Sequence, residues 1–117
     1  MQEFSLLPVN NQRFMATLGG QDCTIQLYQR GHRMFLDLAL DGEMLRQGAL
    51  CVPCLNIVGD CKPFTGAIYC IDNNTDDNSR QEPPEYHGLG ERFRFFYLTP
   101  EEYAEVLEAE AEQIAAM

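Results

Sequence analysis

The chain has 117 residues, of which 45% are hydrophobic and 22% are charged. This length and composition fit one globular domain and exclude an intrinsically disordered chain. Eighteen acidic residues against eight basic ones give a net charge of −10, which argues against general binding to nucleic acids or anionic lipids. The N-terminus has no signal-peptide pattern and no run reaches transmembrane length, so we expect a soluble protein made in a cytoplasm.

Short alternating segments separated by glycine turns fill the first part of the chain. Residues 4–9 form an apolar segment that ends in a turn, as an edge strand or an arm does. Residues 13–18 and 23–28 alternate apolar and polar side chains on either side of Gly19 and Gly20. Adjacent glycines accept positive φ angles easily, so this pattern predicts a hairpin.

We expect residues 33–58 to supply most of the core. The first strand in this stretch places three residues on one face: Leu36, Leu38 and Leu40. The Asp-Gly dipeptide at 41–42 favours a two-residue hairpin turn, and residues 43–47 return as a strand that stops or bends at Gly48. Residues 49–58 are almost continuously apolar, and their proline and strand-forming residues argue against a helix.

The second half of the chain contains two more expected strands, at residues 67–71 and 92–98. The segment between them, residues 73–90, is polar and contains two adjacent prolines; loops of this length in small domains are usually functional or disordered. Thr99 is followed by a proline and, three positions on, by Glu102, which predicts the capped start of a helix running to about residue 115.

About seven short strands and one terminal helix predict an all-β fold, a small antiparallel β-sandwich or barrel with a C-terminal α-helix. The β domain spans residues 1–99, with the long polar loop at 73–90, and the acidic helix occupies residues 100–117. We expect the domain to hold neither the loop nor the helix well, because the loop is polar and an isolated helix of this length is marginal in water. Both are therefore candidate assembly surfaces. The candidate partner-binding residues are Tyr103, Leu107 and Ile114 on the helix and Tyr86 in the loop.

The chain has five cysteines, at positions 23, 51, 54, 61 and 70. An odd number without a signal peptide indicates reduced thiols and not a disulfide framework. Cys51 and Cys54 have the two-residue spacing of a zinc or redox pair, but no second pair follows, and the pair does not open a helix after a strand. We interpret the cysteines as small core residues, with metal binding and redox chemistry as the alternatives.

No motif indicates catalysis. The glycine pairs lack the strand-to-helix context of a phosphate-binding loop, and there is no nucleophile elbow around a serine. His32 and His87 both fall in expected turns, where a histidine is usually a solvated polar residue. The Asp and Asn residues at 73–78 do not have the spacing of a helix-loop-helix calcium site. We therefore predict a protein that is not an enzyme and needs no cofactor.

The order of glycine turns and apolar strands is also distinctive as a whole. Its parts are an opening Leu-Leu-Pro at 6–8, Asn-Gln-Arg-Phe at 11–14, Leu-Gly-Gly-Gln at 18–21, Leu-Asp-Leu at 36–38, Asp-Gly at 41–42, Gly48, Leu50, Pro53, Leu-Gly at 89–90 and Phe-Arg-Phe-Phe-Tyr-Leu at 93–98. Over residues 4–99 this pattern resembles the small baseplate plug proteins of contractile-tailed bacteriophages.

The resemblance implies a structural protein of the virion that plugs the central hub and tube channel of the tail baseplate or helps to assemble it. It implies synthesis in the host bacterial cytoplasm and association with the tail hub and other baseplate proteins. Several copies around a threefold axis are expected, with no direct contact to nucleic acid or membrane. Two alternatives come from composition: an acidic inhibitor that mimics nucleic acid, and a cysteine-based metal-binding module.

Overall fold

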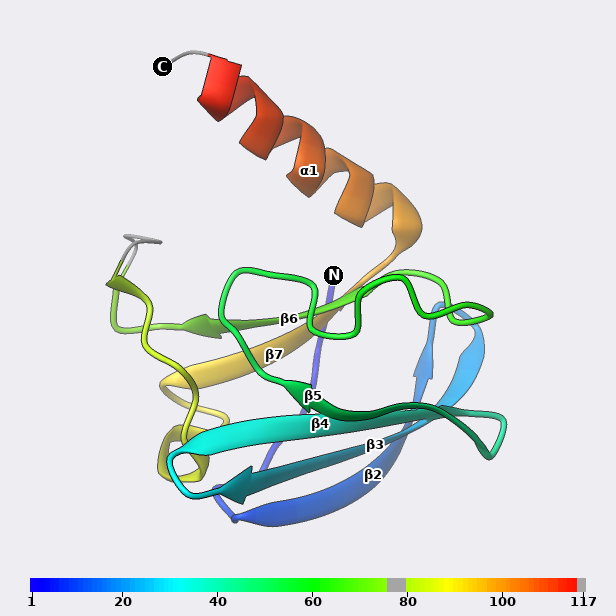
Figure 1. Ribbon diagram of the computed structural model, residues 1–117, viewed down its shortest axis with the longest axis vertical. Coiled ribbons are helices and arrows are strands. Elements are labelled where there is room, and N and C mark those ends of the chain that lie inside the picture. The colour runs from blue at the N-terminus through cyan, green and yellow to red at the C-terminus, as the bar shows by residue number, and fades with distance from the viewer. Residues whose placement is uncertain (76–79, 116–117) are drawn as a thin grey trace.

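Two antiparallel sheets face each other, and one helix projects beyond them (Figure 1). The computed structural model describes residues 1–75 and 80–115, with the helix side chains described as far as residue 111. The strands are β1 (Gln2–Glu3), β2 (Asn11–Leu18), β3 (Gln21–Arg30), β4 (Arg33–Leu40), β5 (Glu43–Leu50), β6 (Ala67–Asp72) and β7 (Phe93–Leu98). One sheet has the order β2-β3-β4-β5 and the other β1-β7-β6. The predicted all-β fold is confirmed in its sandwich form, because the sheets do not close into a barrel.

The four-stranded sheet is a meander built from short hairpins. The turn between β4 and β5 has φ angles of 50° at Asp41 and 82° at Gly42, the positive values that a two-residue type I′ turn requires. Leu36 and Leu38 are fully buried, while Leu40 is partly buried and packs against the core, so the predicted face of β4 is confirmed. β5 bends as predicted near Gly48, where its pairing with β4 shifts register, but it then continues to Leu50.

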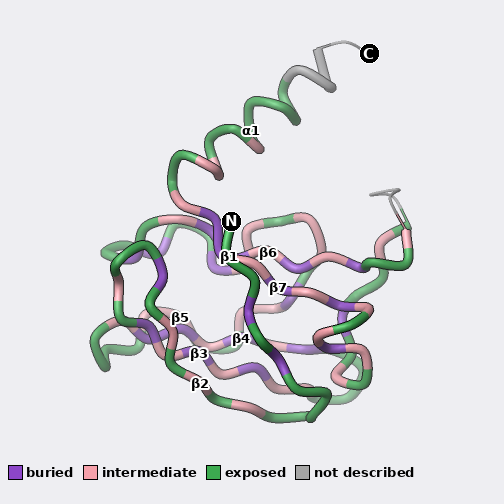
Figure 2. Tube along the Cα trace, turned by 180° about the vertical axis from the view of Figure 1, so that it is seen from behind, coloured by how far each residue is buried: buried purple, intermediate pink, exposed green. Residues whose placement is uncertain are grey.

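The core lies between the two sheets, where Figure 2 shows most of the buried residues. β7 contributes the alternating Phe93, Phe95 and Tyr97, as its sequence pattern predicts. On the facing side, the four-stranded sheet contributes alternating aliphatic residues from β3 and β4: Ile25, Leu27, Leu36 and Leu38. A period of two along each strand therefore accounts for the inner layer of both sheets.

Two expectations for the N-terminal half are wrong. The first strand is β1 at Gln2–Glu3, and of the two alternatives for residues 4–9 the edge strand is wrong and the arm is right: the segment crosses from one sheet to the other and buries Phe4 and Leu6. The apolar run at 49–58 supplies less of the core than expected: Cys51 and Val58 are buried, whereas Leu55 is 58% exposed. Residues 51–58 form a loop that hydrogen-bonds along β6, and Val52 and Leu55 in this loop are exposed.

Candidate functional site

Helix α1 (Pro100–Ala115) carries three of the four predicted partner-binding residues. It begins in the predicted capping box. The Thr99 backbone N–H donates to the Glu102 carboxylate at 2.9 Å, and the Glu102 N–H donates to the Thr99 hydroxyl at 3.3 Å. These bonds satisfy amide groups that a helix start leaves without intrahelical partners. The amino group of Met1 also contacts the Glu102 carboxylate, so the start of the helix is fixed to the sandwich.

Beyond its first turn, α1 rises away from the two sheets (Figures 1 and 2). None of its described residues is buried. The Tyr103 ring meets Tyr69 of β6 edge-on, with ring centroids 6.0 Å apart. Leu107 is one helical turn further on and is 45% exposed, while the side chain of Ile114 lies outside the described residues. Tyr103 and Leu107 thus share one face of the helix, and the sandwich covers only the beginning of that face.

Glutamates occupy much of the remaining surface of α1. Those with described side chains are Glu101, Glu102, Glu105, Glu108 and Glu110. The first two are favourably placed near the positive end of the helix dipole, whereas the later ones have no such compensation, and the last turn contains no basic residue. Burial, with smaller contributions from Tyr103 and Glu110, raises the pKa of Tyr69 in β6 to about 12.

A groove of about 360 Å³ lies between the first turn of α1 and the loop that precedes β6. Tyr103 and Pro100 line one side of it, and Phe64 and Thr65 belong to the other. Further along the same loop, Leu55 is largely exposed, and its neighbour Cys54 lies within electrostatic range of Glu110. The groove is therefore of mixed character, because the loop also contributes Asn56, Asp60 and Lys62 to its lining.

Tyr86, the fourth predicted residue, lies at the other end of β7 from α1. It begins the short 3-10 helix η2 (Tyr86–Gly88), its ring stacks on His87 at 4.0 Å, and its backbone N–H donates to the Gln29 side chain at 2.9 Å. The ring is partly buried against the core. The structure therefore brings Tyr103 and Leu107 together but keeps Tyr86 apart from them.

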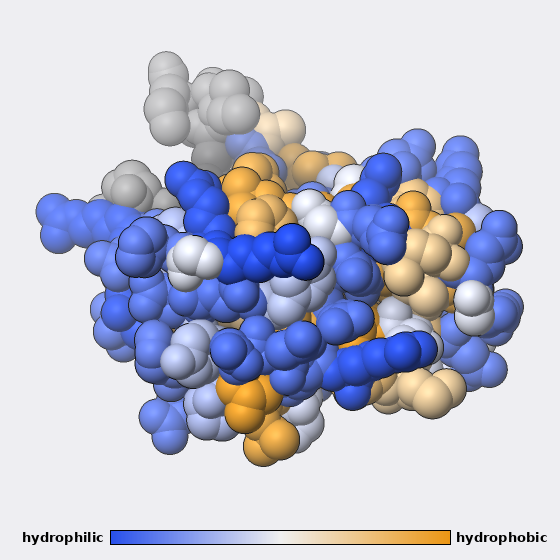
Figure 3. Space-filling model, turned by 60° about the horizontal axis from the view of Figure 1, so that its bottom comes forward, coloured by the Kyte–Doolittle hydropathy of each residue, from blue (hydrophilic) through white to orange (hydrophobic). Residues whose placement is uncertain are grey.

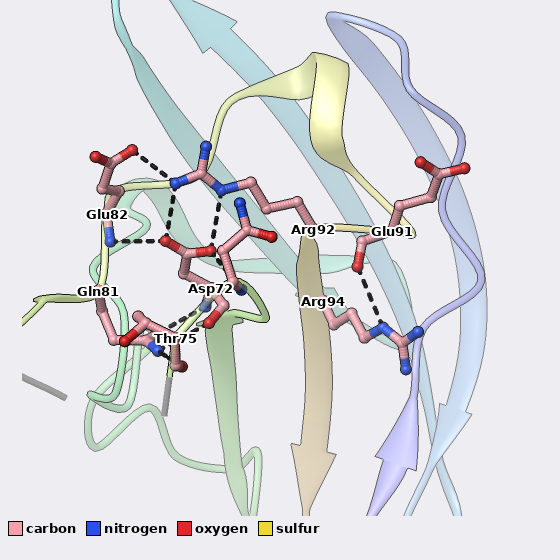
Figure 4. A network of polar contacts seen from close by, with 8 residues as sticks. Asp72, Thr75, Gln81, Glu82, Glu91, Arg92 and Arg94 are labelled. Atoms are coloured by element: carbon pink, nitrogen blue, oxygen red, sulfur yellow. Dashed lines mark hydrogen bonds and ion pairs between the residues drawn. The ribbon is translucent and has the colours of Figure 1, made fainter. Parts of the chain in front are cut away.

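The best-connected polar group is one that sequence reasoning missed. Asp72, the last residue of β6, is buried, and its two carboxylate oxygens accept bonds from the Arg92 guanidinium, both at 3.0 Å (Figure 4). It also accepts the backbone N–H groups of Asn74 and Glu82, and Arg92 in turn bonds the Glu82 carboxylate at 2.7 Å. The only sequence signal was an acidic residue ending an otherwise apolar strand.

This network holds the loop that the sequence predicts to be poorly held. The Gln81 side chain bonds both the backbone N–H and the backbone carbonyl of Asp72, and Pro84 is fully buried. The expectation is therefore wrong for residues 80–90, because a buried carboxylate supplies contacts that a polar composition does not reveal. Residues 76–79 lie outside the described part of the chain.

The electrostatics of Asp72 are those of a structural clamp. The Arg92 hydrogen bonds hold the pKa of Asp72 at about 2, below its usual range. The carboxylate therefore stays ionised at neutral pH with its oxygens already occupied, which suits neither a general base nor a nucleophile.

A shallow hollow of about 490 Å³ lies on the outer face of the four-stranded sheet. Asp37 accepts the Tyr28 hydroxyl at 3.0 Å and the Gly48 N–H at 2.7 Å, and the Tyr28 ring stacks on Phe35 at 5.9 Å. Arg30 covers the Tyr28 ring at 5.4 Å. These contacts fix the bulge in β5 to the neighbouring strands and leave the aromatic ring covered.

The cysteines pack as predicted in the core: Cys23, Cys51, Cys61 and Cys70 are buried and Cys54 is half-buried. Burial raises the pKa of the Cys70 thiol to about 12 and that of Cys23 to about 11, which opposes formation of the thiolate that metals and oxidants require. Within residues 1–75 and 80–115, no group of three or more potential ligands is placed to hold a metal ion.

The described residues thus define a small β-sandwich whose polar groups fix loops and whose helix stands free. A protein-family model described as cyanophage baseplate Pam3 plug gp18 matches residues 1–101. The chain belongs to this family of phage baseplate plug proteins, which places it among the structural components of the phage tail. A comparison with curated proteins gave no match. In the part of the chain that the structure describes, no helix is long and apolar enough to cross a bilayer.

Proposed function

We propose that the protein closes the central channel of the hub and tube in a tail baseplate, or helps to assemble that channel. The observation that carries this proposal is the family match over residues 1–101, which include every strand of the sandwich. A plug needs a stable shape and specific contacts, and both are present in a core that spans two sheets. The proposed role requires neither enzymatic activity nor a cofactor.

The proposed partners are the tail hub and other baseplate proteins, with several copies arranged around a threefold axis. The protein is made in the cytoplasm of the host bacterium and then becomes part of the virion. It makes no direct contact with nucleic acid or membrane, in keeping with its net charge of −10.

Within this role, α1 is the segment that docks on a baseplate partner. The family match ends at residue 101, just inside the helix, so most of α1 lies outside the matched region. Tyr103, Leu107 and Ile114 are the proposed anchors, and the surrounding glutamates favour a partner surface that is basic or rich in amides. Tyr86 is proposed as a second, separate contact.

Charge distribution favours this role over nucleic-acid mimicry. Mimicry requires acidic groups arrayed over the folded body, whereas here six of the eighteen acidic residues lie in α1 and the remaining twelve are offset by eight basic residues. The metal-module alternative is not supported by a cluster of ligands among the described residues, and zinc analysis of the purified protein would test it directly.

The proposal can be tested by deleting the gene from its phage and supplying variants in trans. Purified wild-type particles should contain the protein, and imaging should place it on the tail axis at the baseplate. Leu107→Glu should reduce incorporation at least about tenfold, because a buried charge without a partner costs several kcal/mol in an interface.

Ala109→Glu is the matched control, because it adds the same charge at an exposed position on the far side of α1 from Leu107. It should be incorporated like the wild type. Particles that lack the protein would refute the baseplate role. Normal incorporation of Leu107→Glu would refute only the docking role of α1.

A further inference from the structure

Three of the four edge strands in the sandwich are protected against pairing with another chain. Beside β6, the Cys54 N–H donates to the Cys70 carbonyl at 3.1 Å and the Ile57 N–H donates to the Ile68 carbonyl at 2.9 Å. β5 is interrupted by two register shifts, and β1 has only two residues. Covering, bulging and shortening are the usual ways in which natural sheets block their edges.

The fourth edge, β2, has none of these protections in the part of the chain that the structure describes. It is eight residues long, contains no proline, and pairs with β3 residue by residue without a bulge. The Gln29 N–H donates to the Asn10 carbonyl, so these two residues form a hydrogen-bonded pair. In an antiparallel ladder hydrogen-bonded pairs alternate with non-hydrogen-bonded ones, so the even-numbered residues of β2 bond β3. The backbone groups of Arg13, Met15 and Thr17 therefore point outward, and none of them is hydrogen-bonded by any described residue.

Charges on the four-stranded sheet are separated along the strands. Arg30 and Arg33 face each other at the turn between β3 and β4, and Arg13 lies toward the same end of β2. The other end is acidic, because Asp22 and Asp41 lie together there and the Asp41 N–H donates to the Asp22 carbonyl. Burial raises the pKa of the Cys23 thiol, and both carboxylates raise it as well. β2 itself contains no acidic residue, although the chain carries a net charge of −10.

We propose that in solution, apart from the threefold arrangement proposed for the baseplate, two copies of this chain pair antiparallel along β2, around a twofold axis at Met15, and so join their four-stranded sheets into one. In this register Arg13 of each copy lies opposite Thr17 of the other copy. Thr17 pairs with Asp22 on β3 of its own copy, so Asp22 is the next residue in the same cross-strand row. The basic end of each sheet then meets the acidic end of its partner. A parallel arrangement would place like charges together, which disfavours it.

The inner face of β2 fits the same register. Phe14 and Ala16 pack against the core but remain only partly buried at the open edge. Pairing centred on Met15 puts Phe14 of each copy opposite Ala16 of the other, a large side chain beside a small one. Figure 3 shows a largely hydrophilic surface with separate hydrophobic patches, so we assign most of the affinity to main-chain hydrogen bonds along β2 and the register to its side chains.

Sedimentation equilibrium of the purified full chain, with a reductant present, tests this pairing independently of any role in the baseplate. The wild type should form a dimer as concentration rises. Met15→Lys and Met15→Glu each place like charges opposite each other at the axis and should weaken the dimer at least about tenfold. Met15 is 81% exposed, so neither change should affect folding, as circular dichroism would confirm.

Mixing the two variants in equal amounts should restore a dimer, because lysine then faces glutamate across the axis. Met44→Lys is the control: Met44 is 50% exposed and lies in the same cross-strand row, but on the opposite edge strand. A wild type that stays monomeric, dimers that tolerate both Met15 variants, or a mixture that stays dissociated would each overturn the pairing.

Discussion

The loop after β6 and helix α1 have similar sequence character but different attachment to the body. Both are polar segments that the sequence predicts to be weakly held. The loop is fixed by a buried carboxylate, Asp72, which bonds Arg92 and two backbone amides. The helix has a capping box and one aromatic contact at its first turn, and no described residue beyond that turn is buried.

The difference shows that a polar segment is ordered by the partners within its reach and not by its average hydropathy. One buried acceptor can organise several donors, because leaving any of them unpaired in the interior is costly. Among its described residues α1 has no such acceptor, and it carries several like charges, so the body holds only the first turn of the helix.

The largest effect should come from the body. Leu38→Ala should lower the free energy of unfolding by about 2–5 kcal/mol, because it leaves a cavity at a fully buried site. Leu107→Ala removes the same atoms from α1 and should cost less than about 0.5 kcal/mol, because that side chain is exposed. Urea denaturation of both variants measures the contrast. Equal losses would mean that the helix belongs to the core.

Breaking the loop's attachment should have the next largest effect. Asp72→Asn should destabilise the protein by roughly 1–3 kcal/mol, because it removes the negative charge that pairs with Arg92, whose side chain is 35% exposed. Glu82→Gln is the control, since its carboxylate is exposed and bonds the same arginine. It should cost less than about 1 kcal/mol. Chemical denaturation and amide exchange in residues 80–90 provide the readouts.

The same ion pair predicts an acid dependence. The folded pKa of Asp72 is about 2, below the value of about 3.9 in an unfolded chain. Its contribution to stability is therefore complete above pH 4 and is lost as the pH falls through about 2. The stability difference between wild type and Asp72→Asn should shrink over this range. A constant difference would show that Asp72 acts by shape and not by charge.

The capping box should have a smaller and local effect. Thr99→Ala should destabilise the start of α1 by about 1 kcal/mol, since it removes the hydroxyl that accepts the Glu102 N–H. Thr99→Ser keeps that acceptor and should behave like the wild type. Helical circular dichroism should fall in the alanine variant while the melting temperature of the sandwich stays the same. A shift of that temperature would indicate stronger coupling between helix and body.

Cutting the chain after Pro100 should also change the sandwich little. The loss in its free energy of unfolding should be below about 1 kcal/mol, because α1 contributes no buried residue among those described. Incorporation into particles should nevertheless fail if α1 docks on a partner. If the shortened chain does not fold, the helix is needed by the body and its proposed docking role loses its basis.

Much of this protein follows from local patterns that the chain carries by itself. Alternation placed Leu36, Leu38, Phe93, Phe95 and Tyr97 on inner faces, and Asp41 and Gly42 specified their turn through their φ angles. Thr99 and Glu102 specified the helix start. Each of these features depends on residues only a few positions apart, so the spacing of residues in the sequence is enough to predict it.

Only the tertiary structure decided the features that join distant positions. Asp72 and Arg92 are twenty residues apart, and no local pattern indicates that they meet. The loop at residues 54–57 covers the edge of β6, while no comparable segment hydrogen-bonds the outward groups of β2 among the described residues. Whether an apolar run such as 49–58 is buried, or a polar loop is held, depends on which layer lies against it. Chain topology sets that proximity, and the periodicity of a short segment does not encode it.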